Sequence, residues 1–304
     1  MGMTTRLSLL LLFAVACDRP AEAPDRPSPA PASLPAAAPV RSFSVKVSGR
    51  GRPMILIPGL GCSGEVWRST VEHVAAAGYQ AHVLTLAGFA GQPAVPGGSL
   101  DRVRRDVIEY IRAEHLDHPV LVGHSLGGFL AFWIAATAPD AVGPVIAVDG
   151  VPFLPALLDP DATAESSRAN AAMMRDMLAK QGPEEFARQN RAFLSQMITG
   201  AAALDEVARD SARSDPAAVG RTVHELMTTD IRPLVPAIRT PVLLVAAGQG
   251  LDAGALARYQ SQVSAVPHHR VVVAARARHF VMLDDPGFLF GEMDGFLAGA
   301  AAGN

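Results

Sequence analysis

Short apolar runs alternate with longer amphipathic stretches along the chain from about residue 42 to residue 300. Runs that are rich in β-branched residues predict buried strands, and stretches with apolar positions three or four apart predict helices. The predicted strands are Phe43–Val47, Met54–Ile57, Ala81–Leu86, Val120–Gly123, Val145–Val148, Val242–Ala246 and Arg270–Val273. The predicted helices are Val66–Ala77, Leu100–Glu114, Leu126–Thr137, Ala253–Val266 and Phe288–Leu297. This alternation indicates an α/β fold with a mostly parallel central sheet flanked by helices.

The alternation stops between residues 151 and 236, where no strand is predicted and Ala, Met, Arg and Glu dominate. An insertion of about 85 residues is too long for a loop, so we expect a helical cap inserted before the last two strands. Its Met and Phe side chains either line an apolar substrate site or pack the cap against the rest of the domain. They are Met173, Met174, Met177, Met197, Met227, Phe186 and Phe193.

The N-terminal segment has the pattern of an export signal. Arg6 precedes the apolar run Leu7–Ala16, which is about half the length that a membrane-spanning helix needs. We therefore interpret residues 1–17 as a signal peptide. The run ends in Ala-Val-Ala-Cys, which resembles a bacterial lipobox with Cys17 as the lipidated residue. The alternative is simple secretory cleavage after Ala16, and both predict an exported protein that faces the periplasm or the cell exterior.

Prolines alternate with Ala and Ser in residues 18–41, without hydrophobic periodicity. Such a segment is typical of an extended linker. Together with a lipidated Cys17 it predicts a domain of residues 42–300 that is tethered to a membrane through a lipid anchor only.

Composition and charge exclude several classes of function. The chain has 26 Lys and Arg against 29 Asp and Glu, a formal net charge of −3, and no block of like charges, so no nucleic-acid partner is expected. Its two cysteines cannot form a disulfide framework or a Cys-rich zinc site. We expect no metal and no cofactor, and we interpret Cys62 as a small buried hydrophobic residue.

A Gly-x-Ser-x-Gly pentapeptide, Gly123 to Gly127, lies directly between a predicted strand and a predicted helix. A serine on so tight a turn has strained backbone and is exposed, and the flanking glycines avoid collisions of a Cβ with neighbouring chain. The N–H of Leu126 then lies at a helix N-terminus, where unpaired donors favour a developing oxyanion. These features make Ser125 the candidate nucleophile.

With this pentapeptide in place, the chain resembles the α/β-hydrolase family over nearly all of residues 43–298. The segment from Ile55 to Trp67 is similar to the family's oxyanion loop, with Pro58 in place of the usual His. The resemblance implies that the backbone N–H of Leu60 completes an oxyanion hole with that of Leu126. It also implies the triad order Ser, acid, His, with the His on a loop after the last strand.

His279 fits that position, because Arg278-His279-Phe280 follows the last predicted strand and resembles the family's Gly-His-Phe segment, with Arg278 replacing the Gly. His124 is expected to point away from Ser125 and to serve packing. The resemblance places the acid after the strand that follows the cap, which favours Asp252 although its loop is one residue longer than the family pattern. The alternative is Asp149, at the end of the strand before the cap.

These residues predict a serine carboxylesterase that cleaves short or medium acyl esters, lactones or thioesters through an acyl-enzyme on Ser125. Its partner would be a small-molecule ester. One alternative is a peptidase similar to proline iminopeptidases, in which cap carboxylates such as Glu184 and Glu185 hold an α-amino group. The other alternative is a surface lipoprotein that uses the hydrolase scaffold for binding alone.

Overall fold

The computed structural model describes residues 40–252 and 254–302. The signal peptide, the lipidation of Cys17 and almost all of the linker lie outside these residues. Seven strands are present: β1 (Phe43–Gly49), β2 (Arg52–Ile57), β3 (Tyr79–Leu86), β4 (Val120–His124), β5 (Val145–Val148), β6 (Val242–Ala247) and β7 (His269–Ala274). Each predicted strand is therefore found, with its ends moved by at most two residues.

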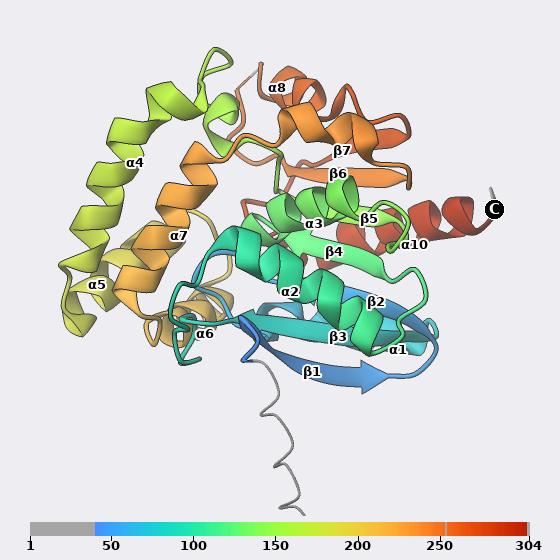
Figure 1. Cartoon of the computed structure of the whole chain (residues 1–304), viewed down its shortest axis with the longest axis horizontal. Helices are drawn as coiled ribbons and strands as arrows, with labels where there is room; N and C mark the ends of the chain where they lie inside the picture. The colour runs from blue at the N-terminus through green and yellow to red at the C-terminus, as the bar shows by residue number, and fades with distance from the viewer. Residues whose placement is uncertain (1–39, 253, 303–304) are drawn as a thin grey trace, which may run out of the picture. The chain divides into compact units, whose positions relative to one another are not determined.

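The strands form one sheet in the order β1-β3-β2-β4-β5-β6-β7 (Figure 1). β1 pairs antiparallel with β3, and all other neighbours are parallel. The carboxyl ends of β2 and β4 to β7 therefore meet at one edge, which is where ligands bind in open parallel sheets.

Helices cover both faces of the sheet. α2 (Leu100–Ala113) and α3 (Leu126–Thr137) lie in front of it in Figure 1, and α1 (Arg68–Ala76) and α10 (Pro286–Ala302) lie behind. Alternate residues of a strand supply the two cores, because successive side chains point to opposite faces. Ile55 and Ile57 belong to the front core, whereas Met54 and Leu56 belong to the rear core.

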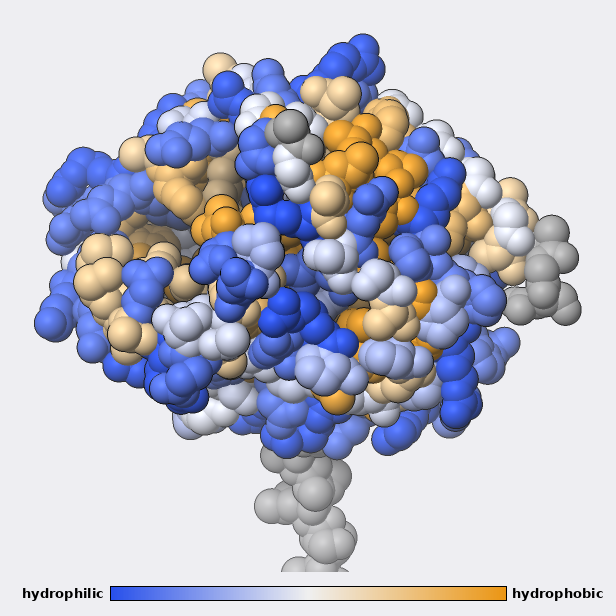
Figure 2. Space-filling model, turned by 90° about the horizontal axis from the view of Figure 1, so that it is seen from above, coloured by the Kyte–Doolittle hydropathy of each residue, from blue (hydrophilic) through white to orange (hydrophobic). Residues whose placement is uncertain are grey.

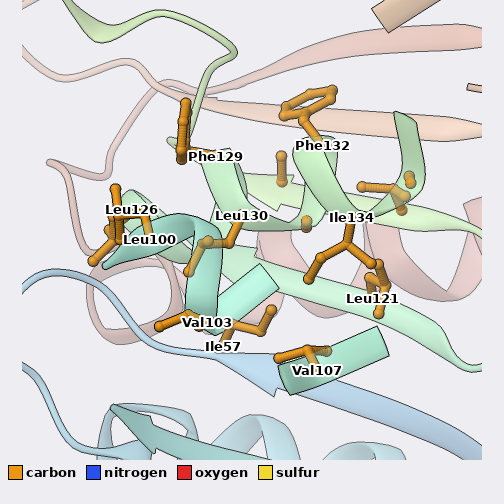
Figure 3. Packing of buried hydrophobic residues seen from close by; sticks show 14 of the residues in the cluster. Ile57, Leu100, Val103, Val107, Leu121, Leu126, Phe129, Leu130, Phe132 and Ile134 are labelled. Atoms are coloured by element: carbon orange, nitrogen blue, oxygen red, sulfur yellow. The ribbon is translucent and has the colours of Figure 1, made fainter. Parts of the chain in front are cut away.

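The front core holds α2 and α3 against the sheet. Figure 3 shows Leu100, Val103 and Val107 of α2 near Ile57 and the side chains of α3. The α3 residues Leu126, Leu130 and Ile134 are fully buried. Burying an aliphatic side chain contributes about 1.5–3 kcal/mol, so this packing holds the N-terminus of α3, and with it residue 125, in a fixed place.

The predicted insertion between β5 and β6 is helical. It contains α4 (Ala164–Ala179), α5 (Pro183–Leu194), α6 (Ala201–Ser211) and α7 (Pro216–Thr228), with 3-10 turns η2 (Leu154–Leu157) and η3 (Arg232–Ala237) at its ends. Two further short elements, η1 (Gly64–Trp67) and α9 (Val281–Asp284), follow β2 and β7, and α8 (Ala255–Val263) follows β6.

This helical insertion is fixed to the loops at the carboxyl edge of the sheet. The hydroxyl of Ser214 donates to the carbonyl of Gly61 at 3.1 Å, and the Asp215 N–H donates to the carbonyl of Gly88 at 2.8 Å. The Phe280 N–H donates to the carbonyl of Met197 at 3.4 Å. The insertion therefore contacts the loops after β2, β3 and β7.

The Met and Phe residues of the insertion divide between packing and solvent. Phe186 is buried, whereas Met173, Met177 and Phe193 are more than half exposed. Of the seven, Met197 borders the groove beside His279 that is described below. On the face shown in Figure 2, hydrophobic residues form separate patches rather than one continuous surface. Met174 and Met227 pack against the front core, so most of these residues serve packing or face solvent.

Within residues 40–252 and 254–302, no helix combines the length and the apolar character that crossing a membrane requires.

Candidate active site

Ser125 occupies the sharp turn between β4 and α3. Its backbone has φ 54° and ψ −116°, a conformation that costs a non-glycine residue of order 1–3 kcal/mol. A Cβ on Gly123 would lie 2.1 Å from the carbonyl oxygen of Gly127, and one on Gly127 would lie 2.1 Å from that of Ile57. The glycines of the pentapeptide are therefore required by close backbone packing, as the sequence predicts.

Two backbone donors flank this turn. Leu126 is the first residue of α3, and Leu60 lies in the loop after β2, where a Cβ on the neighbouring Gly59 would come within 3.4 Å of the Ser125 Cβ. Among the described residues, neither the Leu60 N–H nor the Leu126 N–H donates to a backbone carbonyl. Neither of these two N–H groups is therefore engaged by a backbone carbonyl in that part of the chain.

His279 and Asp149 form a close pair. The Nδ1 of His279 lies 2.5 Å from Oδ2 of Asp149, and their side chains are 23% and 7% exposed. With Nδ1 donating to the carboxylate, the Nε2 of the ring carries the lone pair that can accept a proton. The carboxylate thereby sets the tautomer of the histidine.

Asp149 is held ionised by three donors. Its Oδ1 accepts from the Ala247 N–H at 2.8 Å and from the Tyr259 hydroxyl at 2.6 Å, in addition to the bond from His279. Burial alone raises the pKa of Asp149, but these hydrogen bonds outweigh it, and the pKa lies below its ordinary value. Burial raises the pKa of Tyr259, helped by the adjacent carboxylate, so Tyr259 remains a donor.

The prediction that Asp252 lies against His279 is wrong. The carboxylate of Asp252 bonds to the guanidinium of Arg258 at 2.6 Å and to the Gly254 N–H at 2.8 Å. It is 65% exposed and makes no ion pair with His279 in the described part of the chain. The extra residue after Gly248 carries the loop outward into the start of α8, and the alternative residue, Asp149, takes the place beside His279.

Comparison with known protein families identifies the family to which this chain belongs. The family model described as the alpha/beta hydrolase family matches residues 54–292. The chain belongs to the α/β-hydrolase family. Relatives include carbamate hydrolase RutD of Serratia proteamaculans, 26% identical over 218 residues, which are 65% of this chain and 74% of that protein.

Another relative of this α/β-hydrolase is the pimeloyl-[acyl-carrier protein] methyl ester esterase of Aliivibrio salmonicida. It is 30% identical over 107 residues, 35% of this chain and 39% of that enzyme. Similar solved structures include an esterase from Thermogutta terrifontis (TM-score 0.71, 19% identity, 85% of this chain and 93% of that one). An enol-lactonase from Burkholderia xenovorans has TM-score 0.71 and 17% identity over 84% of this chain and 96% of its own. These structures share the fold.

The structure adds a contact at His124 that the sequence does not reveal. This buried side chain lies with its Nε2 3.0 Å from the carbonyl oxygen of His279, and the two rings are 4.6 Å apart between centroids. Burial holds the pKa of His124 well below its ordinary value, and His279 lowers it further, so the ring is neutral. His124 therefore supports the backbone of the loop that carries His279.

Cys62 is buried as the sequence predicts, and burial raises the pKa of its thiol to about 12. It is thus a neutral packing residue. The part of the chain that the structure describes contains no cluster of three or more His, Cys, Asp or Glu side chains that could hold a metal ion.

A groove lies beside the His279–Asp149 pair. It encloses about 560 Å³ and is open to solvent. Its lining comes from the ends of β5 and β6, the loop after β6, α8, the segment between α5 and α6, and the loop after β7. It includes Gln249, Leu251, Met197, Arg278, Tyr259 and His279. The groove borders the helical insertion at Ser195, Gln196 and Met197.

Proposed function

We propose that this α/β-hydrolase is a serine carboxylesterase that cleaves short or medium acyl esters, lactones or thioesters through an acyl-enzyme on Ser125. The observation that carries the proposal is the 2.5 Å bond between His279 and the buried Asp149. A buried carboxylate that fixes the tautomer of a partly exposed histidine is the arrangement a general base requires.

In the proposed reaction the Ser125 hydroxyl oxygen attacks the carbonyl carbon, and Nε2 of His279 takes the hydroxyl proton. The tetrahedral intermediate collapses when the bond to the leaving group breaks and His279 returns the proton to the departing oxygen. A water molecule, deprotonated by His279, then attacks the acyl-enzyme, and the acid is released. Asp149 stabilises the imidazolium in both halves without taking the proton.

The N–H groups of Leu60 and Leu126 would bind the oxyanion of the intermediate. Neither donates to a backbone carbonyl among the described residues, so an oxyanion can use both without breaking a bond. Removing one such donor typically costs about 10²–10³ in rate. The names of the relatives support acyl chemistry, since an ester and an enol lactone are both opened by attack on a carbonyl carbon.

Neither alternative function has support from a specific contact. Glu184 and Glu185 are exposed in the first turn of α5, where Glu185 accepts a hydrogen bond from Gln189 at 3.0 Å. A binding-only scaffold would gain nothing from the strained backbone at Ser125, which persists only where the surroundings impose it.

Hydrolysis of p-nitrophenyl butyrate by the folded domain tests the proposal. Ser125→Ala is expected to reduce kcat by at least about 10⁴, because the nucleophile is lost while the backbone at this position stays compatible with a small side chain. Ser264→Ala is the matched control, since Ser264 is exposed at the C-terminal end of α8. Retention of most activity in Ser125→Ala, with wild-type folding by circular dichroism, would refute the proposal.

We also propose that the protein is exported and anchored through a lipid on Cys17. The support is the sequence alone: the apolar run, the lipobox-like end and the proline-rich segment.

A further inference from the structure

Arg278 stands out in the groove because its charge is not paired. Its guanidinium makes one hydrogen bond, from Nη1 to the carbonyl of Ser195 at 3.1 Å, and no ion pair with a carboxylate among the described residues. Its neighbours differ: Arg276 pairs with Asp285, and Arg258 pairs with Asp252. The Arg278 side chain therefore keeps donors available on the groove side.

The backbone of Arg278 is fixed. Its N–H donates to Oδ2 of Asp284 at 2.9 Å, and Oδ1 of Asp284 accepts from the N–H and hydroxyl of Thr199 at 2.9 and 2.7 Å. The carboxylate of Asp284 is thus engaged by neutral donors of the backbone and of the helical insertion. These bonds hold Arg278 next to His279 at the rim of the groove.

The other groove residues do not neutralise this cation. Asp149 is the acidic residue in the lining, and its oxygens already accept from His279, Ala247 and Tyr259. The remaining lining is neutral: Ser195, Gln196, Met197, Gln249, Gly250 and Leu251. A guanidinium with unused donors beside neutral groups is a binding site for an anion such as a carboxylate.

The position of His279 determines which part of an ester would lie in the groove beside Arg278. His279 must protonate the leaving oxygen, so the alcohol portion of the substrate has to lie against this ring, whereas the carbonyl oxygen faces Leu60 and Leu126. His279 lines the groove, whereas Ser125, Leu60 and Leu126 do not, so the part of the substrate that passes His279 would enter the groove and the acyl portion would stay outside it. We infer that the natural substrate is an ester whose alcohol portion carries a carboxylate, and that Arg278 binds this carboxylate. The inference rests on the proposed function of Ser125 and His279.

Two butyrate esters test it: 4-carboxyphenyl butyrate, which is anionic, and 4-(methoxycarbonyl)phenyl butyrate, which is neutral. The readout is the ratio of kcat/KM for the anionic ester to that for the neutral one. Comparing this ratio between variants cancels the different intrinsic reactivities of the two phenols. Arg278→Gln is expected to lower the ratio about tenfold or more, Arg278→Lys is expected to retain most of it, and Arg278→Glu is expected to lower it furthest.

Arg188→Gln is the matched control, because it removes one positive charge from an exposed position on α5. It is expected to leave the ratio unchanged. Raising the ionic strength should lower the wild-type ratio towards that of Arg278→Gln, since salt screens a partly exposed charge. A general disturbance of the His279 loop would reduce both rates together and leave the ratio constant.

An unchanged ratio in Arg278→Gln and Arg278→Glu, with the neutral ester still hydrolysed in a Ser125-dependent manner, would overturn the inference and leave the proposed function intact. A second pair of esters tests the assignment to the alcohol portion: p-nitrophenyl hydrogen glutarate, which carries its charge on the acyl portion, and the neutral p-nitrophenyl pentanoate. The assignment would be overturned if changes at Arg278 altered the kcat/KM ratio of this pair and not that of the two butyrate esters. Absence of Ser125-dependent hydrolysis of every ester would refute the proposed function itself.

Discussion

The loops after β5 and β6 leave neighbouring parallel strands, and each carries an aspartate, yet the two carboxylates have opposite surroundings. Asp149 is 7% exposed and bonds to His279, whereas Asp252 is 65% exposed and bonds to Arg258. Three donors converge on Asp149 from β6, α8 and the loop after β7. Asp252 bonds to Arg258 and to backbone N–H groups at the start of α8, the helix that follows it.

This contrast shows what makes a carboxylate suitable to orient a partly exposed histidine. An ionised carboxylate loses hydration on burial and must recover it from hydrogen bonds. Asp149 has those bonds, and its pKa lies below the ordinary value in spite of burial. Asp252 is solvated and could not exclude water from a bond to an imidazole.

The largest expected effect separates the two aspartates directly. Asp149→Asn is expected to lower kcat for p-nitrophenyl butyrate by something approaching 10⁴, the magnitude known for a triad acid changed to an amide, because the imidazole is then held in the wrong tautomer. Asp252→Asn is expected to stay within about threefold of wild type, since an exposed ion pair contributes little.

Steady-state kinetics of the two variants provide the comparison, and thermal unfolding provides the control for folding. A crippled Asp252→Asn beside an active Asp149→Asn would show that the loop after β6 rearranges in solution to reach His279.

A smaller effect is expected at His124, which supports the His279 loop from the other side. His124→Phe removes the bond to the carbonyl of His279 and is expected to lower kcat about tenfold with little change in KM, because a displaced general base weakens the chemical step more than binding. His124→Gln keeps a donor and is expected to recover part of the loss. Equal activity of His124→Phe and wild type would show that His124 is not needed to position His279.

The smallest effect concerns the pH range over which Asp149 stabilises the fold. A carboxyl whose pKa is lowered by folding contributes stability above its unfolded pKa, and this contribution is lost as the pH falls through the folded pKa. Tyr259→Phe removes one donor, so the pKa of Asp149 rises and the loss begins at a higher pH. Melting temperatures measured from pH 7 to pH 3 should therefore fall earlier for Tyr259→Phe, with a difference of about 1–3 kcal/mol in stability at most.

If the two melting curves run parallel over this range, the Tyr259 hydroxyl does not contribute to the ionisation of Asp149. Tyr110→Phe is a useful comparison, because the hydroxyl of Tyr110 bonds to His82, away from the His279–Asp149 pair.

The centre of the sheet was predictable because its strands are buried on both faces and read as continuous apolar runs, as in Val145–Val148 and Val242–Ala246. The turn at Ser125 was predictable because its five-residue motif lies directly between a strand pattern and a helix pattern, although Gly127 is required by its approach to Ile57 of β2. These signals are local in the sequence.

The sequence named both Asp252 and Asp149 as partners for His279, but the choice between them was not predictable, because it depends on contacts between distant residues. The bond joins residues 130 apart, and Tyr259, which supports it, lies in a helix with no signal that its hydroxyl points to a carboxylate. The position of Asp252 after the strand that follows the insertion favoured the other loop, although the spacing from Gly248 is one residue longer than the family pattern. The lining of the groove, in which Arg278 forms no ion pair with any described carboxylate, likewise emerges only when separate segments of the chain are placed together.

Activation of Ser125 by His279 and Asp149 is tested most directly by the rate at which a fluorophosphonate probe labels Ser125. Intact-protein mass spectrometry measures this rate. If Asp149 orients His279 as the general base for Ser125, wild type and Asp252→Asn are labelled at similar rates, Asp149→Asn is labelled more slowly by several orders of magnitude, and Ser125→Ala is not labelled. Rapid labelling of Asp149→Asn together with slow labelling of Asp252→Asn, or labelling that persists in Ser125→Ala, would contradict this activation of Ser125.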